Sequence, residues 1–92
     1  RRFLLIGFFI LFLGNLFAQD AQTLFRQGNR LYQQGQYTQA VQNYSKILKS
    51  GYESGALYFN LGNAYYKLDS LALARVNYER ARRFLKNDRA LQ

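Results

Sequence analysis

The sequence predicts an all-α fold in which antiparallel helix-turn-helix units repeat every 34 residues and stack into a short solenoid. The first observation is that apolar residues from Ala21 onward recur at spacings of three and four, the period of an amphipathic helix. The second is that the stretch GNRLYQQGQYTQA, which begins at Gly28, is echoed by GNAYYKLDSLALA, which begins at Gly62. A two-helix unit with this period is typical of solenoids, because one unit buries its apolar face only against a neighbour.

Residues 1–18 resemble a secretory signal peptide and are expected to form an N-terminal signal helix. Two arginines precede an apolar run from Phe3 to Leu13, and the small residue Ala18 stands where cleavage would follow. The run is shorter than the roughly 20 apolar residues that a membrane-spanning helix needs. We therefore expect a cleaved signal and an exported protein of the periplasm or cell envelope. An uncleaved membrane anchor and a buried core helix are the alternatives.

Residues 19–92 are expected to form the repeat domain, with helices at 20–34, 37–49, 54–68 and 71–86. Asp20 and Ser54 are expected N-caps, because their side-chain oxygens can accept hydrogen bonds from free backbone N–H groups. The expected turns are Gly35-Gln36 and Asp69-Ser70.

The first unit then covers about 21–54 and the second about 55–88. Asn87-Asp88 are expected to cap a further helix that starts at 89–92. Because repeat arrays generally need three units or a capping helix, we expect either a longer protein or a partner or second copy that covers the open end.

The composition argues against catalysis. The chain has no cysteine and no histidine, which removes the commonest metal ligands and the commonest general base. Its five carboxylates are scattered and form no catalytic pair, and no glycine-rich phosphate loop is present. We therefore expect no enzyme activity, no cofactor, no metal and no small-molecule substrate. The carboxylates are Asp20, Glu53, Asp69, Glu79 and Asp88.

The repeated residues resemble the tetratricopeptide repeat (TPR) family. The positions of its pattern are occupied by Leu24, Gln27-Gly28, Leu31, Ala40, Tyr44 and Tyr52 in the first unit, and by Tyr58, Leu61-Gly62, Tyr65, Ala74, Tyr78, Ala81 and Lys86 in the second. Departures are Gln27 in place of leucine, Ile47 where the second unit has Ala81, and the absence of proline. The resemblance implies a right-handed solenoid with a structural signature of Gly28, Ala40, Tyr44, Gly62, Ala74, Tyr78 and Ala81.

A narrower resemblance comes from GYESGALYFNLGNAYYK, residues 51–67, together with the signal-like start. It is similar to exported TPR proteins of the Bacteroides aerotolerance (Bat) system. This resemblance implies an envelope complex linked to aerotolerance.

The resemblance also implies that the first helix of each unit lines a concave face that binds a protein or peptide. We expect that face to carry Phe25, Asn29, Tyr32, Gln33, Phe59, Asn63, Tyr66 and Lys67. Gln22, Arg26 and Asn60 are expected at its flanks. The alternative is that the asparagines hydrogen-bond within the fold and the aromatic residues form core. The family's carboxylate-binding version has lysine where Phe25 and Phe59 stand, so a free C-terminal carboxylate is not expected as ligand.

Positive charge gathers late in the chain, whose formal net charge is +8. The residues concerned are Arg75, Arg80, Arg82, Arg83, Lys86 and Arg89. A basic helix of this kind could associate with an anionic membrane surface or with nucleic acid, and this is the alternative function. Export argues against nucleic acid, and a solvated outer face is the simpler interpretation.

Overall fold

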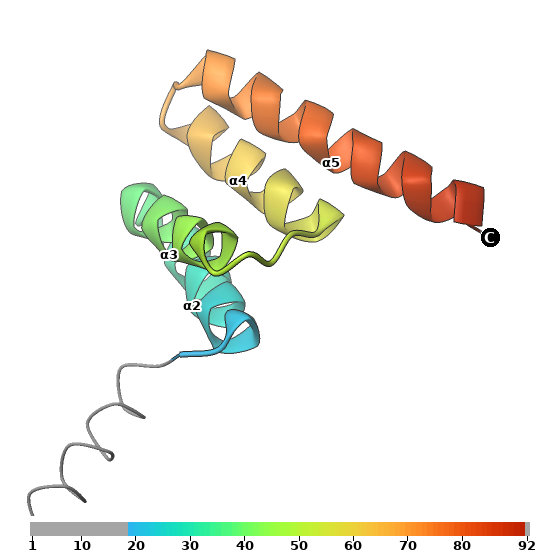
Figure 1. Cartoon of the computed structure of the whole chain (residues 1–92). Helices are drawn as coiled ribbons and strands as arrows, with labels where there is room; N and C mark the ends of the chain where they lie inside the picture. The colour runs from blue at the N-terminus through green and yellow to red at the C-terminus, as the bar shows by residue number, and fades with distance from the viewer. Residues whose placement is uncertain (1–18, 92) are drawn as a thin grey trace, which may run out of the picture.

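The computed structural model describes residues 19–91, which form four helices and no strand and are arranged as two hairpins (Figure 1). The helices are α2 (Ala21–Gln33), α3 (Tyr37–Lys49), α4 (Gly55–Lys67) and α5 (Leu71–Leu91). α2 packs on α3, α4 packs on α5, and α3 lies against α4, so the second hairpin stacks on the first. The expected all-α class is confirmed, whereas the expected signal helix at 1–18 lies outside the described residues.

Both expected N-caps are present. Asp20 Oδ1 accepts a hydrogen bond from the backbone N–H of Thr23 at 2.7 Å, and Ser54 Oγ accepts one from that of Leu57 at 3.0 Å. The hydrogen bond from Thr23 lowers the pKa of the Asp20 carboxyl below its ordinary value. These caps fix where α2 and α4 begin, because they satisfy N–H groups that have no partner within the helix.

The two turns within the hairpins share one backbone conformation. Gly35 has φ +78° and Asp69 has φ +62°, so both lie in the left-handed region. Glycine adopts this region without steric cost, and aspartate is one of the few other residues that tolerates it. The turns are therefore where the sequence predicts them.

The expected end of the fourth helix at Lys86 is wrong. α5 continues without a break to Leu91, and the expected new helix at 89–92 is absent from the described part of that segment. Asn87 and Asp88 can cap a helix, but neither glycine nor proline is there to end the preceding one. The residues assigned to a further helix up to Leu91 therefore extend the second hairpin.

The core lies inside and between the hairpins. Its fully buried large side chains are Tyr44, Ile47, Leu57 and Leu61. The signature alanines are buried as well, with Ala40, Ala74 and Ala81 at most 3% exposed. Among the described residues every buried side-chain nitrogen and oxygen atom has a hydrogen-bond partner. The polar groups enclosed between the helices therefore carry no unpaired desolvation cost.

The signature glycines make room for tyrosine rings. A Cβ atom on Gly28 would lie 2.6 Å from the ring of Tyr44, and one on Gly62 would lie 2.6 Å from the ring of Tyr78. Such distances are far inside van der Waals contact, so each hairpin closes only because its first helix lacks a side chain at this position.

Candidate functional site

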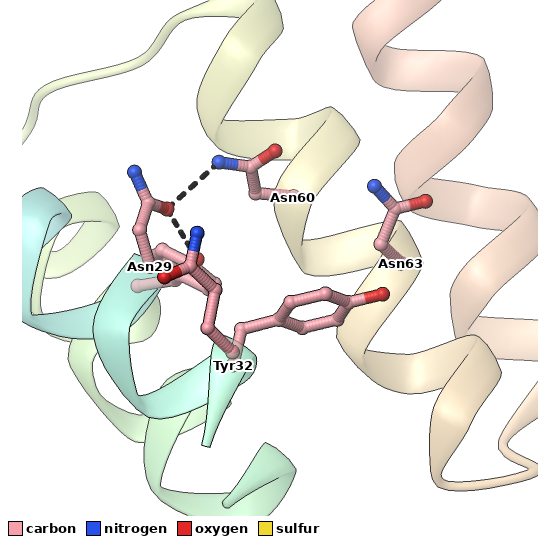
Figure 2. Close-up of a pocket in the computed structure, with 6 residues that line it drawn as sticks. Asn29, Tyr32, Asn60 and Asn63 are labelled. Carbon is pink, nitrogen blue, oxygen red and sulfur yellow. Dashed lines mark hydrogen bonds between the residues drawn. The ribbon is translucent and has the colours of Figure 1, made fainter. Parts of the chain in front are cut away.

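A hollow of about 220 Å³ opens between α2 and α4, the first helices of the two hairpins. Its lining is dominated by carboxamides and phenols (Figure 2). α2 contributes Asn29, Tyr32 and Gln33, α4 contributes Asn60 and Asn63, and Tyr44 of α3 lies between them. We call this set the amide hollow. It carries no formally charged side chain, so what it offers a ligand is hydrogen bonding.

Two hydrogen bonds fix Asn29. Its Oδ1 accepts from Tyr44 Oη at 2.5 Å and from Asn60 Nδ2 at 2.9 Å, and the second bond joins the two hairpins (Figure 2). Asn63 Oδ1 accepts in the same way from Tyr78 Oη, at 2.7 Å. The alternative interpretation of the asparagines is therefore correct for their oxygens, which are engaged within the fold.

The nitrogens of the same two amides are differently placed. Neither Asn29 Nδ2 nor Asn63 Nδ2 donates a hydrogen bond to another described residue. Because an amide nitrogen carries two N–H donors, each side chain presents a donor group at the hollow while its oxygen is held from behind. Asn60 complements them, since its Oδ1 accepts no bond from the described part of the chain.

The buried tyrosine keeps this orientation across the ordinary pH range. Burial raises the pKa of Tyr44 to about 12, because the ionised phenolate would lose its hydration. Burial likewise raises the pKa of Tyr78, with a smaller contribution from Tyr32 and Tyr66. Both phenols therefore remain O–H donors to the asparagine oxygens.

The structure does not gather all eight predicted binding residues into one site. Asn29, Tyr32, Gln33 and Asn63 line the amide hollow, whereas Phe59, Tyr66 and Lys67 lie exposed on α4 outside it. Phe59 is 52% exposed and packs against the ring of Tyr78 with a centroid separation of 5.8 Å.

Phe25 belongs to a second hollow along the same two helices. This hollow measures about 640 Å³ and lies at the N-terminal ends of α2 and α4. Its lining is mainly apolar and includes Ala21, Phe25, Ile47, Tyr52, Ala56 and Leu57. We call it the apolar hollow. Phe25 and Phe59, expected on one common face, thus sit in different surroundings.

The sequence pattern does not predict that two residues, Asn60 and Tyr44, line the amide hollow. Asn60 is expected only at the flank, yet its amide bridges the hairpins. Its position three residues before Asn63 puts both on one helix face, and this spacing could have indicated it. Tyr44 is expected as a structural residue alone, and no local signal shows that its hydroxyl reaches Asn29.

The basic residues of α5 from Arg75 to Lys86 are outside the linings of both hollows. Arg82 pairs with Glu79 at 2.9 Å, and this hydrogen bond lowers the pKa of the Glu79 carboxyl. Arg80 lies over the ring of Tyr58, 5.7 Å from its centroid. Arg75, Arg83 and Lys86 are exposed to solvent.

Two further features of residues 19–91 bear on function. This part of the chain holds no group of three or more potential metal-ligating side chains of the His, Cys, Asp or Glu type. None of its helices combines the length and apolar character that a bilayer crossing requires.

The sequence profile of the tetratricopeptide repeat family matches residues 25–89. Searches among curated proteins and solved structures found no match.

Proposed function

The chain belongs to the tetratricopeptide repeat family, and from this membership we propose that it binds an extended segment of a partner protein along α2 and α4. Repeats of this family commonly mediate protein–protein interaction and generally serve as non-catalytic scaffolds. The observation that carries the proposal is the amide hollow, where Asn29 and Asn63 turn amide nitrogens outward from equivalent places in the two hairpins.

The chemistry of the hollow fits a peptide backbone. A peptide carbonyl accepts hydrogen bonds, and Asn29 Nδ2 and Asn63 Nδ2 supply donors for it. A peptide N–H needs an acceptor, which Asn60 Oδ1 supplies. Because the oxygens of Asn29 and Asn63 are already held by the phenols of Tyr44 and Tyr78, these amides are oriented before a ligand arrives, which reduces the entropy lost on binding.

The apolar hollow supports a second element of recognition. It lies on the same pair of helices as the amide hollow, toward their N-terminal ends. We propose that an apolar side chain of the ligand enters it beside Phe25 and Leu57, while the neighbouring backbone contacts the asparagines. This arrangement combines affinity from apolar burial with direction from hydrogen bonds.

The proposal extends to cellular location. Export to the cell envelope is supported by the two arginines, the apolar run of Phe3 to Leu13 and the small residue Ala18. A role in an envelope complex linked to aerotolerance is supported by the phrase at residues 51–67. Protease digestion of intact cells whose outer membrane has been permeabilised tests the location, and survival of the protein until the cells are lysed would contradict it.

A matched pair of double variants tests the peptide site. Asn29→Asp with Asn63→Asp keeps an oxygen for Tyr44 and Tyr78 to donate to, but replaces both outward donors with acceptors. We expect this double variant to bind peptides selected from a random display library about tenfold or more weakly. Two hydrogen bonds of ~0.5–1.5 kcal/mol each are lost, and carboxylate oxygens then face the carbonyl oxygens of the peptide.

The control carries the same change of charge on α3, where Gln39 and Gln42 are exposed. Gln39→Glu with Gln42→Glu is expected to bind the selected peptides as the wild type does. Fluorescence anisotropy measures the affinity, and circular dichroism verifies that both variants are folded. Equal affinities for the asparagine variant and the control would overturn the assignment of the amide hollow.

A further inference from the structure

One flank of α5 carries a straight row of charged side chains. Arg75, Glu79, Arg82 and Lys86 follow one another at spacings of four, three and four, which places them along one face of the helix. All four are exposed, and the side chains of Arg82 and Glu79 are 69% and 48% exposed. We call this row the α5 stripe. Along the helix its charges are positive, negative, positive and positive.

In the first hairpin, α3 is the helix equivalent to α5, and its corresponding flank is partly buried. Residues of α3 at the corresponding places are Val41, Ser45 and Leu48. All three are half-buried, and Val41 and Leu48 pack against the core of the stacked hairpins. Because α3 also contacts α4, we infer that this flank takes part in the contact between one hairpin and the next.

On α5 the same flank replaces the two apolar residues with arginines. Arg75 stands where α3 has Val41, and Arg82 stands where it has Leu48. A surface of this kind does not stack on an apolar helix, because a guanidinium group buried without a partner loses its hydration and gains no compensating charge. The flank is therefore suited to a partner that brings its own charges.

We propose that the α5 stripe docks an acidic helix of a partner protein. The occupant carries acidic side chains opposite Arg75, Arg82 and Lys86 and a basic one opposite Glu79. The row runs over twelve residues, and its ends lie roughly 16 Å apart along the helix, which corresponds to about three turns of the partner. Leu71 lies 56% exposed one turn before Arg75 and supplies an apolar contact at one end.

The pattern of signs favours a protein over a polyanionic surface. Glu79 lies in the middle of the stripe and is held by Arg82 at 2.9 Å. A lipid headgroup layer or a nucleic acid would present negative charge to this carboxylate, whereas a partner helix can place a lysine or arginine there. Complementary charges of this kind act mainly on specificity and on the rate of association.

A second copy of the chain is a poor occupant. The chain has thirteen basic residues and five acidic ones, with a formal net charge of +8. Two copies therefore repel each other, and the scattered carboxylates do not reproduce the row of acidic residues that the stripe requires.

The test uses the full chain and a synthetic helical peptide of about 20 residues, long enough to form an isolated helix. The peptide carries three glutamates and one lysine at the spacing of the stripe. We expect Arg75→Glu with Arg82→Glu to weaken its binding about tenfold or more, and a peptide with lysines in place of the two facing glutamates to restore binding to this variant. Fluorescence anisotropy at low and high salt provides the readout.

The control is Lys46→Glu with Lys49→Glu, which makes the same change of charge at exposed positions of α3. It is expected to bind the acidic peptide within about twofold of the wild type. An equal loss in the control, or no restoration by the lysine peptide, would overturn the proposal. Polyglutamate of the same length, duplex DNA and phosphatidylglycerol vesicles are run in parallel. If reversal of the stripe weakens any of them as much as it weakens the matched peptide, the stripe is a general anion-binding surface.

Discussion

The two hairpins share one interior contact, between a glycine and a tyrosine ring, and differ on their outer flanks. Each closes around a glycine that accommodates a tyrosine ring, and each tyrosine donates its hydroxyl to the asparagine that follows the glycine. On the flank beyond, α3 presents Val41 to its neighbour and α5 presents Arg75 to solvent.

The difference separates two kinds of position. At some, the residue type is determined by contacts within the hairpin, and at others it is determined by whether a neighbouring helix buries the position. Gly28 and Gly62 each lie against a tyrosine ring of their own hairpin, so glycine is required at both positions. Val41 is apolar because α4 lies against α3, whereas the corresponding flank of α5 is solvated. Burial, rather than the repeat itself, decides the residue type at these places.

The largest test of this comparison is the pair Ile47 and Ala81, which occupy corresponding positions and are 1% and 2% exposed. Ile47 packs in the core shared by the two hairpins, so Ile47→Ala is expected to lower the free energy of unfolding by about 2–5 kcal/mol. Ala81→Ile is expected to cost about 1–3 kcal/mol, because the added atoms have no space. Urea denaturation measures both. A loss below about 1 kcal/mol for Ile47→Ala would show that the junction between hairpins is loosely packed.

The sequence predicts the parts of this fold that depend on local chemistry. Helical spacing finds the four helices, and the oxygens of Asp20 and Ser54 locate the starts of α2 and α4. It does not predict the continuation of α5 beyond Lys86, because Asn87 and Asp88 are compatible with either a cap or a helix interior.

The candidate site is predicted only in part, for a related reason. Spacing places Phe25 and Asn29 on one face of α2, but whether they line the same hollow depends on how α4 approaches. The reach of Tyr44 Oη to Asn29 is also a distance between helices. Such distances arise from packing of side chains far apart in the sequence, which a spacing rule does not contain.

The second test fills the space beside the tyrosine rings. Gly28→Ala is expected to destabilise the protein by about 1–3 kcal/mol, because Tyr44 is 1% exposed and its ring cannot move aside. Gly62→Ala is expected to cost less, since Tyr78 is only half-buried and its ring can shift toward solvent. Thermal unfolding of the two variants compares them. A greater loss for Gly62→Ala would contradict the idea that the enclosed ring is the more rigid one.

The third test removes the tyrosine hydroxyls and uses pH. Tyr44→Phe is expected to cost about 0.5–1.5 kcal/mol, because Asn29 loses a buried donor, and Tyr78→Phe less, because water can reach Asn63. Burial raises the pKa of Tyr44 from 10.0 to about 12, so its folded form holds the proton more tightly than its unfolded form. The stability that the protonated Tyr44 phenol contributes is complete below pH 10 and is lost as the pH rises toward 12.

Urea titrations between neutral pH and pH 12 are therefore expected to show a steep loss of stability in the wild type. The loss is expected to be shallower in Tyr44→Phe and less altered in Tyr78→Phe, because the Tyr78 side chain is only half-buried. Parallel curves for the wild type and Tyr44→Phe would contradict the assignment of this titration to Tyr44.

The smallest test exchanges residues at the two turns, where Gly35 and Asp69 both have positive φ. Asp69→Gly is expected to change stability by well under 1 kcal/mol, because glycine relieves the strain of the left-handed backbone but also gains entropy when unfolded. A Cβ atom added at Gly35 has no neighbour within 4 Å, so the loss of stability in Gly35→Ala, expected at about 1 kcal/mol, comes from backbone strain alone. Denaturation with guanidinium resolves the two effects. If Gly35→Ala is neutral, the first turn relaxes to a negative φ, and the backbone conformation that the hairpins share is not required for either of them to close.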